Sequence, residues 1–288
     1  SFINSFAEVF DFSRSSVQIW AHVYTVLVMG IDTPRAPLDQ SRITSALSRY
    51  WRVSVVDLTA STQDDLAEKI IAGDGKSGDV IAANYQSAGR GRLDRTFLAP
   101  PSTALLFSIY LNPERSRDDW GFIPLLAGFS IAQTLRKINA NVSIKWPNDL
   151  YVGKQKIGGI LIEQQLKGAQ LEWSILGCGI NVNEAPELEQ ATSIFKETNQ
   201  RFKPLTVLAE YLDLLNGQQH LLYGDFAHLK AKFEAELWLK DTIQVFEKTD
   251  GTRFEGCIVG VNDAGEIRIE TNGKIAHFAN QELRYRSS

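Results

Sequence analysis

The sequence has few of the residues that build metal sites and disulfide frameworks. Its 288 residues include two cysteines and four histidines. Cys178 and Cys257 are far apart in the chain, and no two histidines stand at a metal-ligand spacing. We therefore predict neither a zinc site nor a disulfide-stapled scaffold, and free thiols suit a reducing, cytoplasmic compartment.

Long apolar runs and an excess of positive charge are also lacking. The apolar stretch 17–29 is interrupted by Gln18 and His22 and is shorter than the roughly 20 residues that span a bilayer. Arg14 alone precedes it, which is too little basic charge for a signal peptide. The formal net charge is −4, which argues against a whole surface that grips nucleic acid. We expect neither a membrane nor DNA as a partner.

Residues 1–36 differ from the rest of the chain. The sequence starts at Ser1, and Met29 is its one methionine, so we interpret residues 1–28 as an upstream extension and Met29 as a candidate start. The segment 1–36 is expected to be poorly structured. It contains no two short helices joined by a glycine-containing turn, so no helix-turn-helix is predicted.

From residue 37 onward, hydrophobic periodicity predicts an α+β fold in two parts. After a helix that begins near Asp39, the expected strands are 52–58, 79–85, 104–111, 143–146, 150–152, 156–164 and 171–182, and the expected helices are 62–72, 123–138, 204–222 and 225–239. Short strands at 243–246, 254–261, 266–270 and 275–278 follow, separated by Gly- and Asn-containing turns. We predict a larger domain at 37–238 and a small antiparallel β-barrel at 239–288.

A loop rich in arginine and glycine follows the strand that ends near Gln86. It reads Gly89-Arg90-Gly91-Arg92-Leu93-Asp94-Arg95. Glycines allow backbone N–H groups to approach a ligand, and arginines give bidentate donors for carboxylate and phosphate. The pattern is neither a P-loop nor a dinucleotide-binding fingerprint. It indicates an anion cradle, with a flexible basic surface loop as the plainer alternative.

A second group of polar residues lies on the predicted hairpin that follows. It comprises Lys145-Trp146-Pro147-Asn148-Asp149 and then Lys156-Ile157-Gly158-Gly159. A hairpin of this length can bring both ammonium groups to one pocket, where an anion would offset the cost of removing them from water. The plainer alternatives are turn chemistry for Asn148 and Asp149 and surface positions for the lysines.

Two further segments carry weaker signals. Ser61-Thr62-Gln63 offers hydroxyls and an amide at a strand end, although Ser61 is equally suited to cap the next helix. Gly177 and Gly179 alternate along a strand that continues to Asn181 and Asn183. Alternating glycines indicate close approach by a ligand or another chain, or else a bulged strand.

Taken together, in this order and spacing, these motifs resemble the biotin protein ligase family. The resemblance runs from about Pro37 to the C-terminus. It implies a mixed sheet with flanking helices, as in the class II aminoacyl-tRNA synthetases, and a small C-terminal β-barrel. It also implies that biotin and ATP form biotinyl-5'-AMP and that biotin then passes to a lysine of an acceptor. The expected acceptor is the biotin carboxyl carrier domain of a carboxylase.

The resemblance also implies a role for each matching residue. The catalytic residues would be Lys156, Arg92 and Lys145. Biotin would contact Ser61, Thr62, Gln63, Gln86, Arg90, Gly91, Arg92, Lys156 and Gly158. The nucleotide would contact Arg92, Arg95, Lys145, Trp146, Asn148, Asp149 and Asn181. Mg²⁺ would arrive with ATP rather than be held by the protein alone.

Two positions depart from the family pattern, and so does the N-terminus, where the DNA-binding helix-turn-helix of some family members is not predicted. Gln63 stands where the family has asparagine, and Phe97 where tryptophan is common. Three other functions are alternatives: a lipoate ligase of the same fold, a non-enzymatic nucleotide-binding module and a DNA-binding repressor. No covalent nucleophile is predicted, and Cys178 is assigned to packing. The sequence leaves open whether two copies form a homodimer.

Overall fold

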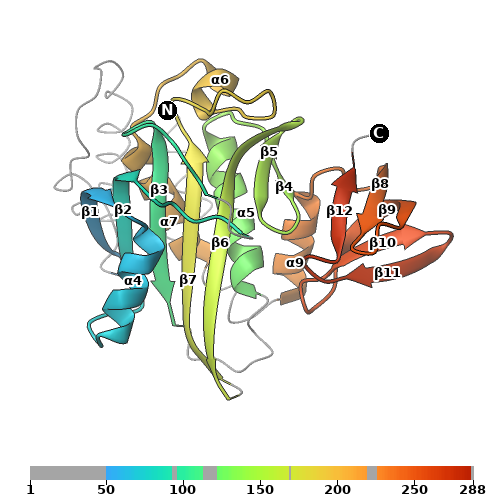
Figure 1. The fold of residues 1–288 in the computed structure, drawn as a ribbon, viewed down its shortest axis with the longest axis horizontal. Coiled ribbons are helices and arrows are strands. Elements are labelled where there is room, and N and C mark those ends of the chain that lie inside the picture. Colours follow the sequence, from blue (N-terminus) through green and yellow to red (C-terminus); the bar gives the residue numbers. More distant parts are fainter. Residues whose placement is uncertain (1–49, 93–95, 113–121, 169, 219–225, 287–288) are drawn as a thin grey trace, which may run out of the picture.

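The computed structural model describes residues 50–92, 96–112, 122–168, 170–218 and 226–286 (Figure 1). The predicted extension 1–36, the helix expected after Asp39 and the side chain of Arg95 lie outside these ranges. In the described residues, two β-sheets lie side by side with helices around the larger one.

The larger sheet has seven strands in the order β1-β2-β3-β7-β6-β5-β4. β1 and β2 are parallel, and every other neighbouring pair is antiparallel. The strands are β1 (Arg52–Thr59), β2 (Asp79–Gln86), β3 (Ala104–Leu111), β4 (Val142–Lys145), β5 (Asp149–Val152), β6 (Gln155–Lys167) and β7 (Gln170–Asn181). The α+β class and the mixed sheet predicted from the sequence are confirmed, and each of these strands lies within a few residues of its expected range.

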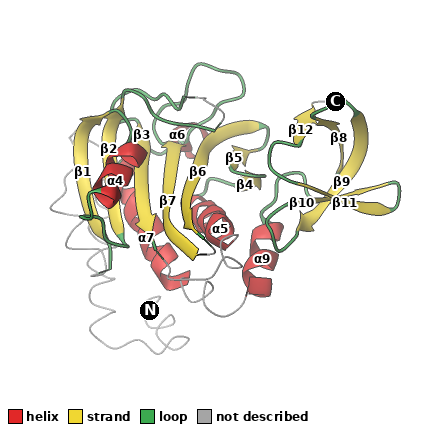
Figure 2. Cartoon of the chain, turned by 60° about the horizontal axis from the view of Figure 1, so that its bottom comes forward, coloured by secondary structure: helices red, strands yellow, loops and turns green. Residues whose placement is uncertain are grey.

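Helices cover both faces of this sheet (Figure 2). On one face, α4 (Thr62–Ile71) buries Leu66 against Tyr110 and Ile175. On the other face lie α5 (Phe122–Lys137), α7 (Pro204–Gln218) and α9 (Phe226–Ala235), with α6 (Ile194–Thr198) in the connection after β7. Because both faces are covered, β3 is an almost continuous apolar run. None of the described helices is long and apolar enough to cross a bilayer.

The smaller sheet is antiparallel and has the order β11-β10-β9-β8-β12. Its strands are β8 (Ile243–Lys248), β9 (Arg253–Val261), β10 (Ile267–Thr271), β11 (Lys274–Phe278) and β12 (Leu283–Arg286). The sequence predicted the first four and missed β12. The short helix α6 was missed as well, since a five-residue helix has too few turns to show periodicity.

One hydrophobic core runs under both sheets. Phe246 and Ile258 of the smaller sheet belong to the same buried cluster as Ile144 of β4. Hydrogen bonds join the two parts as well: the Val261 N–H donates to Glu234 Oε1 at 2.8 Å, and the Trp146 indole N–H donates to the Gly265 carbonyl at 3.0 Å. A boundary between 238 and 239 therefore remains a prediction, because the packing on its two sides is continuous.

Candidate active site

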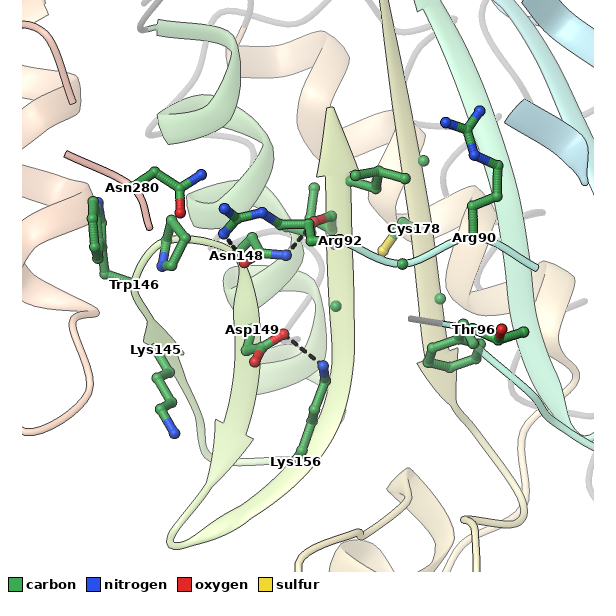
Figure 3. Close-up of a pocket in the computed structure, with 18 of the residues that line it drawn as sticks. Arg90, Arg92, Thr96, Lys145, Trp146, Asn148, Asp149, Lys156, Cys178 and Asn280 are labelled. Carbon is green, nitrogen blue, oxygen red and sulfur yellow. Dashed lines mark hydrogen bonds and ion pairs between the residues drawn. The ribbon is translucent and has the colours of Figure 1, made fainter. Parts of the chain in front are cut away.

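A pocket of about 810 Å³ opens between the α4 face of the large sheet and the small sheet (Figure 3). This volume suits a substrate or cofactor of several rings. Its wall comes from the N-terminus of α4, the end of β2, the arginine–glycine loop, the β4–β5 turn, β6, β7 and the segments around β12. The predicted motifs are thus brought together in one place, although they are spread over a hundred residues.

The polar residues at the N-terminus of α4 line one end of the pocket. The Ser61 hydroxyl accepts from the backbone N–H groups of Gln63 and Asp64, so it caps the helix as the plainer interpretation proposed. The Thr62 hydroxyl lies 2.8 Å from that of Ser108, and the Thr62 N–H donates to Gln86 Oε1 at 2.7 Å. The carboxamide of Gln86 is therefore held with its oxygen occupied, which leaves the nitrogen as the group suited to donate to a ligand.

The glycines of β7 make room for side chains of the same chain. A Cβ on Gly177 would lie 2.0 Å from Gln63 Oε1, and a Cβ on Gly179 would lie 3.0 Å from the Phe97 ring. The alternating glycines predicted that a group lies close to the β7 backbone. In this structure those groups are the side chains of Gln63 and Phe97. These two residues are also the ones that depart from the family pattern.

Arg90 sits at the pocket mouth between two carboxylates. Its guanidinium bonds Asp64 of α4 at 2.6 Å and forms a closer ion pair with Glu163 of β6. Gln63 Nε2 donates to the same Glu163 carboxylate at 3.0 Å. Burial lowers the pKa of Arg90, but the two carboxylates outweigh it and the net pKa is raised. Arg90 therefore ties the arginine–glycine loop to the helix and the sheet.

Arg92 and Lys156 reach the opposite wall of the pocket. Arg92 Nη1 donates to Asn148 Oδ1 at 2.9 Å, and Asn148 Nδ2 donates in turn to the Ile160 carbonyl at 2.8 Å. Lys156 Nζ lies 2.6 Å from Asp149 Oδ1, and the two side chains face each other from β6 and β5 in Figure 3. The site thus holds two cationic groups in fixed positions, each oriented by a neighbour from the Asn148-Asp149 turn.

Lys145 is surrounded by aromatic rings. Its ammonium lies 4.5 Å from the ring centroid of Tyr151, 4.8 Å from that of Trp238 and 5.0 Å from that of Tyr285. It also donates to the Tyr151 hydroxyl at 3.2 Å. Burial lowers the pKa of Lys145, and the charge of Lys156 lowers it further, against the opposing effect of Asp149.

The small sheet supplies a wall that the sequence did not predict. The pocket is lined there by Thr249, Asn280, Gln281, Leu283, Arg284, Tyr285 and Arg286. Trp146 fastens this wall to the β4–β5 turn, since its indole N–H donates to the Gly265 carbonyl at 3.0 Å. No local motif marks these residues, so the sequence offered no signal for them.

Two predicted site residues, Gly158 and Asn181, do not line this pocket, and the position of a third is not described. A Cβ on Gly158 would lie 2.5 Å from the Gly179 carbonyl oxygen, so Gly158 faces the neighbouring strand. Asn181 is buried and donates to the Thr192 carbonyl at 2.9 Å. Arg95 lies outside the described residues. Cys178 is buried beside the pocket, and burial raises its thiol pKa, which agrees with a packing role.

Comparison with known proteins finds similarity to one family. The model of the biotin/lipoate A/B protein ligase family matches residues 55–181, the segment that holds most of the pocket wall. It is 34% identical over 183 residues to the bifunctional ligase/repressor BirA of Salmonella typhimurium, covering 59% of this chain and 56% of that protein. It is 31% identical over 165 residues to the biotin–[acetyl-CoA-carboxylase] ligase of Mycobacterium tuberculosis, covering 54% and 60%.

The fold agrees with that of a solved relative. The biotin protein ligase from Aquifex aeolicus in complex with biotin and ATP superposes with a TM-score of 0.68 at 27% identity, covering 82% of this chain and 99% of that one. The chain thus spans little more than half the length of the Salmonella relative and nearly the whole of the Aquifex chain. The family resemblance predicted from the motifs is confirmed.

Proposed function

We propose that this protein is a biotin protein ligase, which makes biotinyl-5'-AMP from biotin and ATP and transfers biotin to a lysine of an acceptor protein. The observation that carries the proposal is one pocket in which a polar end, formed by Ser61 to Gln63 and Gln86, adjoins a cationic end with Arg92, Lys145 and Lys156. The match of residues 55–181 to the family model and the similarity to the Aquifex protein, which is in complex with biotin and ATP, support it.

The polar end suits a ureido ring. Such a ring carries N–H donors and a carbonyl acceptor on an otherwise apolar bicycle. The Gln86 nitrogen and the Thr62–Ser108 hydroxyl pair supply donors and acceptors, while Phe97 and Leu161 add apolar surface nearby. Gln63 and Gly91 are proposed to complete this end, with Gln63 leaving its place against Gly177 when the ring enters.

The cationic end suits two anions that must meet. The carboxylate of biotin attacks the α-phosphorus of ATP, which forms the mixed anhydride and releases pyrophosphate. Two unit charges at 4 Å repel by about 4 kcal/mol at an effective dielectric of 20. Lys156 and Arg92 offset that repulsion and stabilise the charge that develops on the phosphoryl oxygens. Arg90 is proposed to leave its ion pair with Glu163 and to bind the substrate carboxylate instead.

The nucleotide is proposed to lie along Lys145, Trp146, Asn148 and Asp149. Asp149 is the single carboxylate among the described residues that line the pocket. One carboxylate together with substrate phosphates is a common way of binding Mg²⁺. Asp149 therefore fits a Mg²⁺ ion that arrives with ATP, whose charge would help to neutralise the triphosphate.

The second step needs no nucleophile from this chain. The ε-amine of the acceptor lysine attacks the acyl carbon of the anhydride, AMP departs with the bond electrons, and the amine loses its proton. Positioning and electrostatics carry such a step. We propose a biotin carboxyl carrier domain as the acceptor, which agrees with the name of the Mycobacterium relative.

The finer features of the fold and the cellular setting belong to the same proposal. The large sheet is proposed to be of the class II aminoacyl-tRNA synthetase type, and the small sheet to be a β-barrel. Cys178 and Cys257 are both free thiols, which suits a reducing, cytoplasmic compartment.

The deciding experiment measures pyrophosphate release from ATP with biotin, with lipoate and with neither acid. Biotin-dependent release, followed by transfer of labelled biotin to a carboxyl carrier domain, is the expected result. Release with lipoate instead would favour the lipoate ligase. ATP binding without release in either case would overturn the enzyme assignment in favour of a nucleotide-binding module.

A further inference from the structure

We propose that Tyr285 is a positioning residue for the nucleotide: with Tyr151 and Trp238 it forms an aromatic cage that holds the Lys145 ammonium ready for the triphosphate. This inference rests on the proposed function and adds a residue and a task to it. The cage is defined by the rings of Tyr151, Trp238 and Tyr285.

The cage brings together three separate parts of the chain. Tyr151 lies on β5, Trp238 follows α9, and Tyr285 lies on β12 of the small sheet. The ring centroids of Tyr151 and Trp238 are 5.1 Å apart, and those of Trp238 and Tyr285 are 5.8 Å apart. Trp238 is itself fixed, because its indole N–H donates to the Gly153 carbonyl at 2.6 Å. The rings thus pack on one another as well as on the cation.

The aromatic environment of Lys145 differs from the environment of Lys156, the other lysine that lines the pocket. Lys156 is paired with a carboxylate at 2.6 Å, so an incoming anion must share its ammonium with Asp149. Within the described part of the chain, no carboxylate forms an ion pair with Lys145, and its ammonium meets ring faces and a phenol instead. Ring faces attract a cation through their quadrupole without cancelling its charge. Among the described residues, Lys145 therefore has no ion-paired carboxylate to give up when an anion arrives.

The cage also fixes where that charge points. A lysine has four rotatable bonds, and ordering them on binding would cost free energy. Lys145 is ordered before binding, because β4 holds its backbone and the cage holds its ammonium at the pocket wall. Tyr285 lines the same pocket and packs on Phe246 behind it, at 5.5 Å between ring centroids. The small sheet therefore sets the position of a lysine in the large one.

The test compares Tyr285→Leu, which removes the ring face, with Tyr285→Phe, which keeps it. Phe254→Leu is the matched control, since Phe254 also packs on Phe246, at 5.7 Å between ring centroids, but is not one of the three rings that surround the Lys145 ammonium. Each variant is assayed for biotin-dependent pyrophosphate release, with separate KM values for ATP and biotin. We expect Tyr285→Leu to raise the KM for ATP by about 3- to 30-fold and to leave the KM for biotin unchanged. Tyr285→Phe should restore most of the loss.

A second measurement does not depend on activity. Ring faces shift the NMR signals of the Lys145 ε-methylene upfield, and the Lys145→Arg variant assigns those signals in the full chain. Tyr285→Leu should move them toward the values of exposed lysines. Trp238→Phe against Trp238→Leu repeats the comparison where Tyr285→Leu does not fold.

Three results would overturn the proposal: an unchanged KM for ATP in Tyr285→Leu, equal losses in Tyr285→Phe and Tyr285→Leu, or a Lys145 signal that does not move. Failure of the proposed function is distinct, because the unmodified protein would then release no pyrophosphate while its Lys145 signal would still report the cage.

Discussion

Replacing Lys156 with alanine removes a cation that faces the pocket and leaves Asp149 without its partner at 2.6 Å. A unit charge about 4 Å from an anion contributes about 4 kcal/mol at an effective dielectric of 20 and about 1 kcal/mol in water. The side chain of Lys156 is 39% exposed, which places the loss between these limits, at about 2–3 kcal/mol. Each 1.36 kcal/mol is a factor of ten in rate, so kcat/KM for adenylate formation should fall by about 30- to 150-fold.

The matched control is Lys154→Ala on the same hairpin. Lys154 is exposed in the β5–β6 turn and does not line the pocket, so its loss changes the net charge equally without touching the site. Pyrophosphate release from ATP and biotin under single-turnover conditions reports the step directly. If Lys156→Ala and Lys154→Ala give equal rates, the role assigned to Lys156 is wrong.

Three further predictions concern the loop and the small sheet. Arg92→Ala removes a charge-assisted donor worth about 1.5–3 kcal/mol, so bound biotinyl-AMP should escape about 10- to 150-fold faster in a filter assay; an unchanged escape rate would contradict the loop's role. Glu163→Gln removes a carboxylate that competes for Arg90, so calorimetry should find biotin bound about 2- to 5-fold more tightly, the modest change expected of an exposed ion pair; weaker binding would refute the exchange. The pKa of Glu247 is lowered from 4.5 to about 2, chiefly by Arg286, so its stabilisation is present above pH 4.5 and is lost as the pH falls toward 2. Denaturant unfolding of Glu247→Gln should therefore give lower stability than the unmodified protein at pH 7 and a smaller loss between pH 4.5 and 2; parallel pH profiles would argue against the ion pair.

Most of the large sheet was predictable because its signals are local. The apolar run of β3, the alternation of β1 and the glycine turns between β5, β6 and β7 each mark a strand without reference to the rest of the chain. β12 was missed, although Leu283 to Arg286 alternates apolar and charged residues. What makes it a strand is its pairing with β8, with Tyr285 opposite Phe246, and such pairing is a property of the folded molecule.

The site residues also fall into those that local motifs indicate and those that only the folded structure brings into the site. The residue types of the arginine–glycine loop and the β4–β6 hairpin indicate anion binding, so Arg92, Lys145, Asp149 and Lys156 could be named as candidate site residues before the fold was known. The ring environment of Lys145 could not be, because Tyr285 lies 140 residues further along the chain. Gln63 is intermediate: alternating glycines predicted that something approaches β7, but only the structure identifies its side chain as the occupant.

Because β12 lies near the end of the chain, the pocket is completed late in the synthesis of the protein. The ribosome makes the α4 cap, the loop and the hairpin lysines first, and these can assemble on the large sheet while later residues are still being added. The pocket lacks one wall, and Lys145 lacks one of its three rings, until Leu283 to Arg286 emerge and pair with β8. Under the proposed function, a nascent chain is therefore expected to complete its nucleotide contacts last.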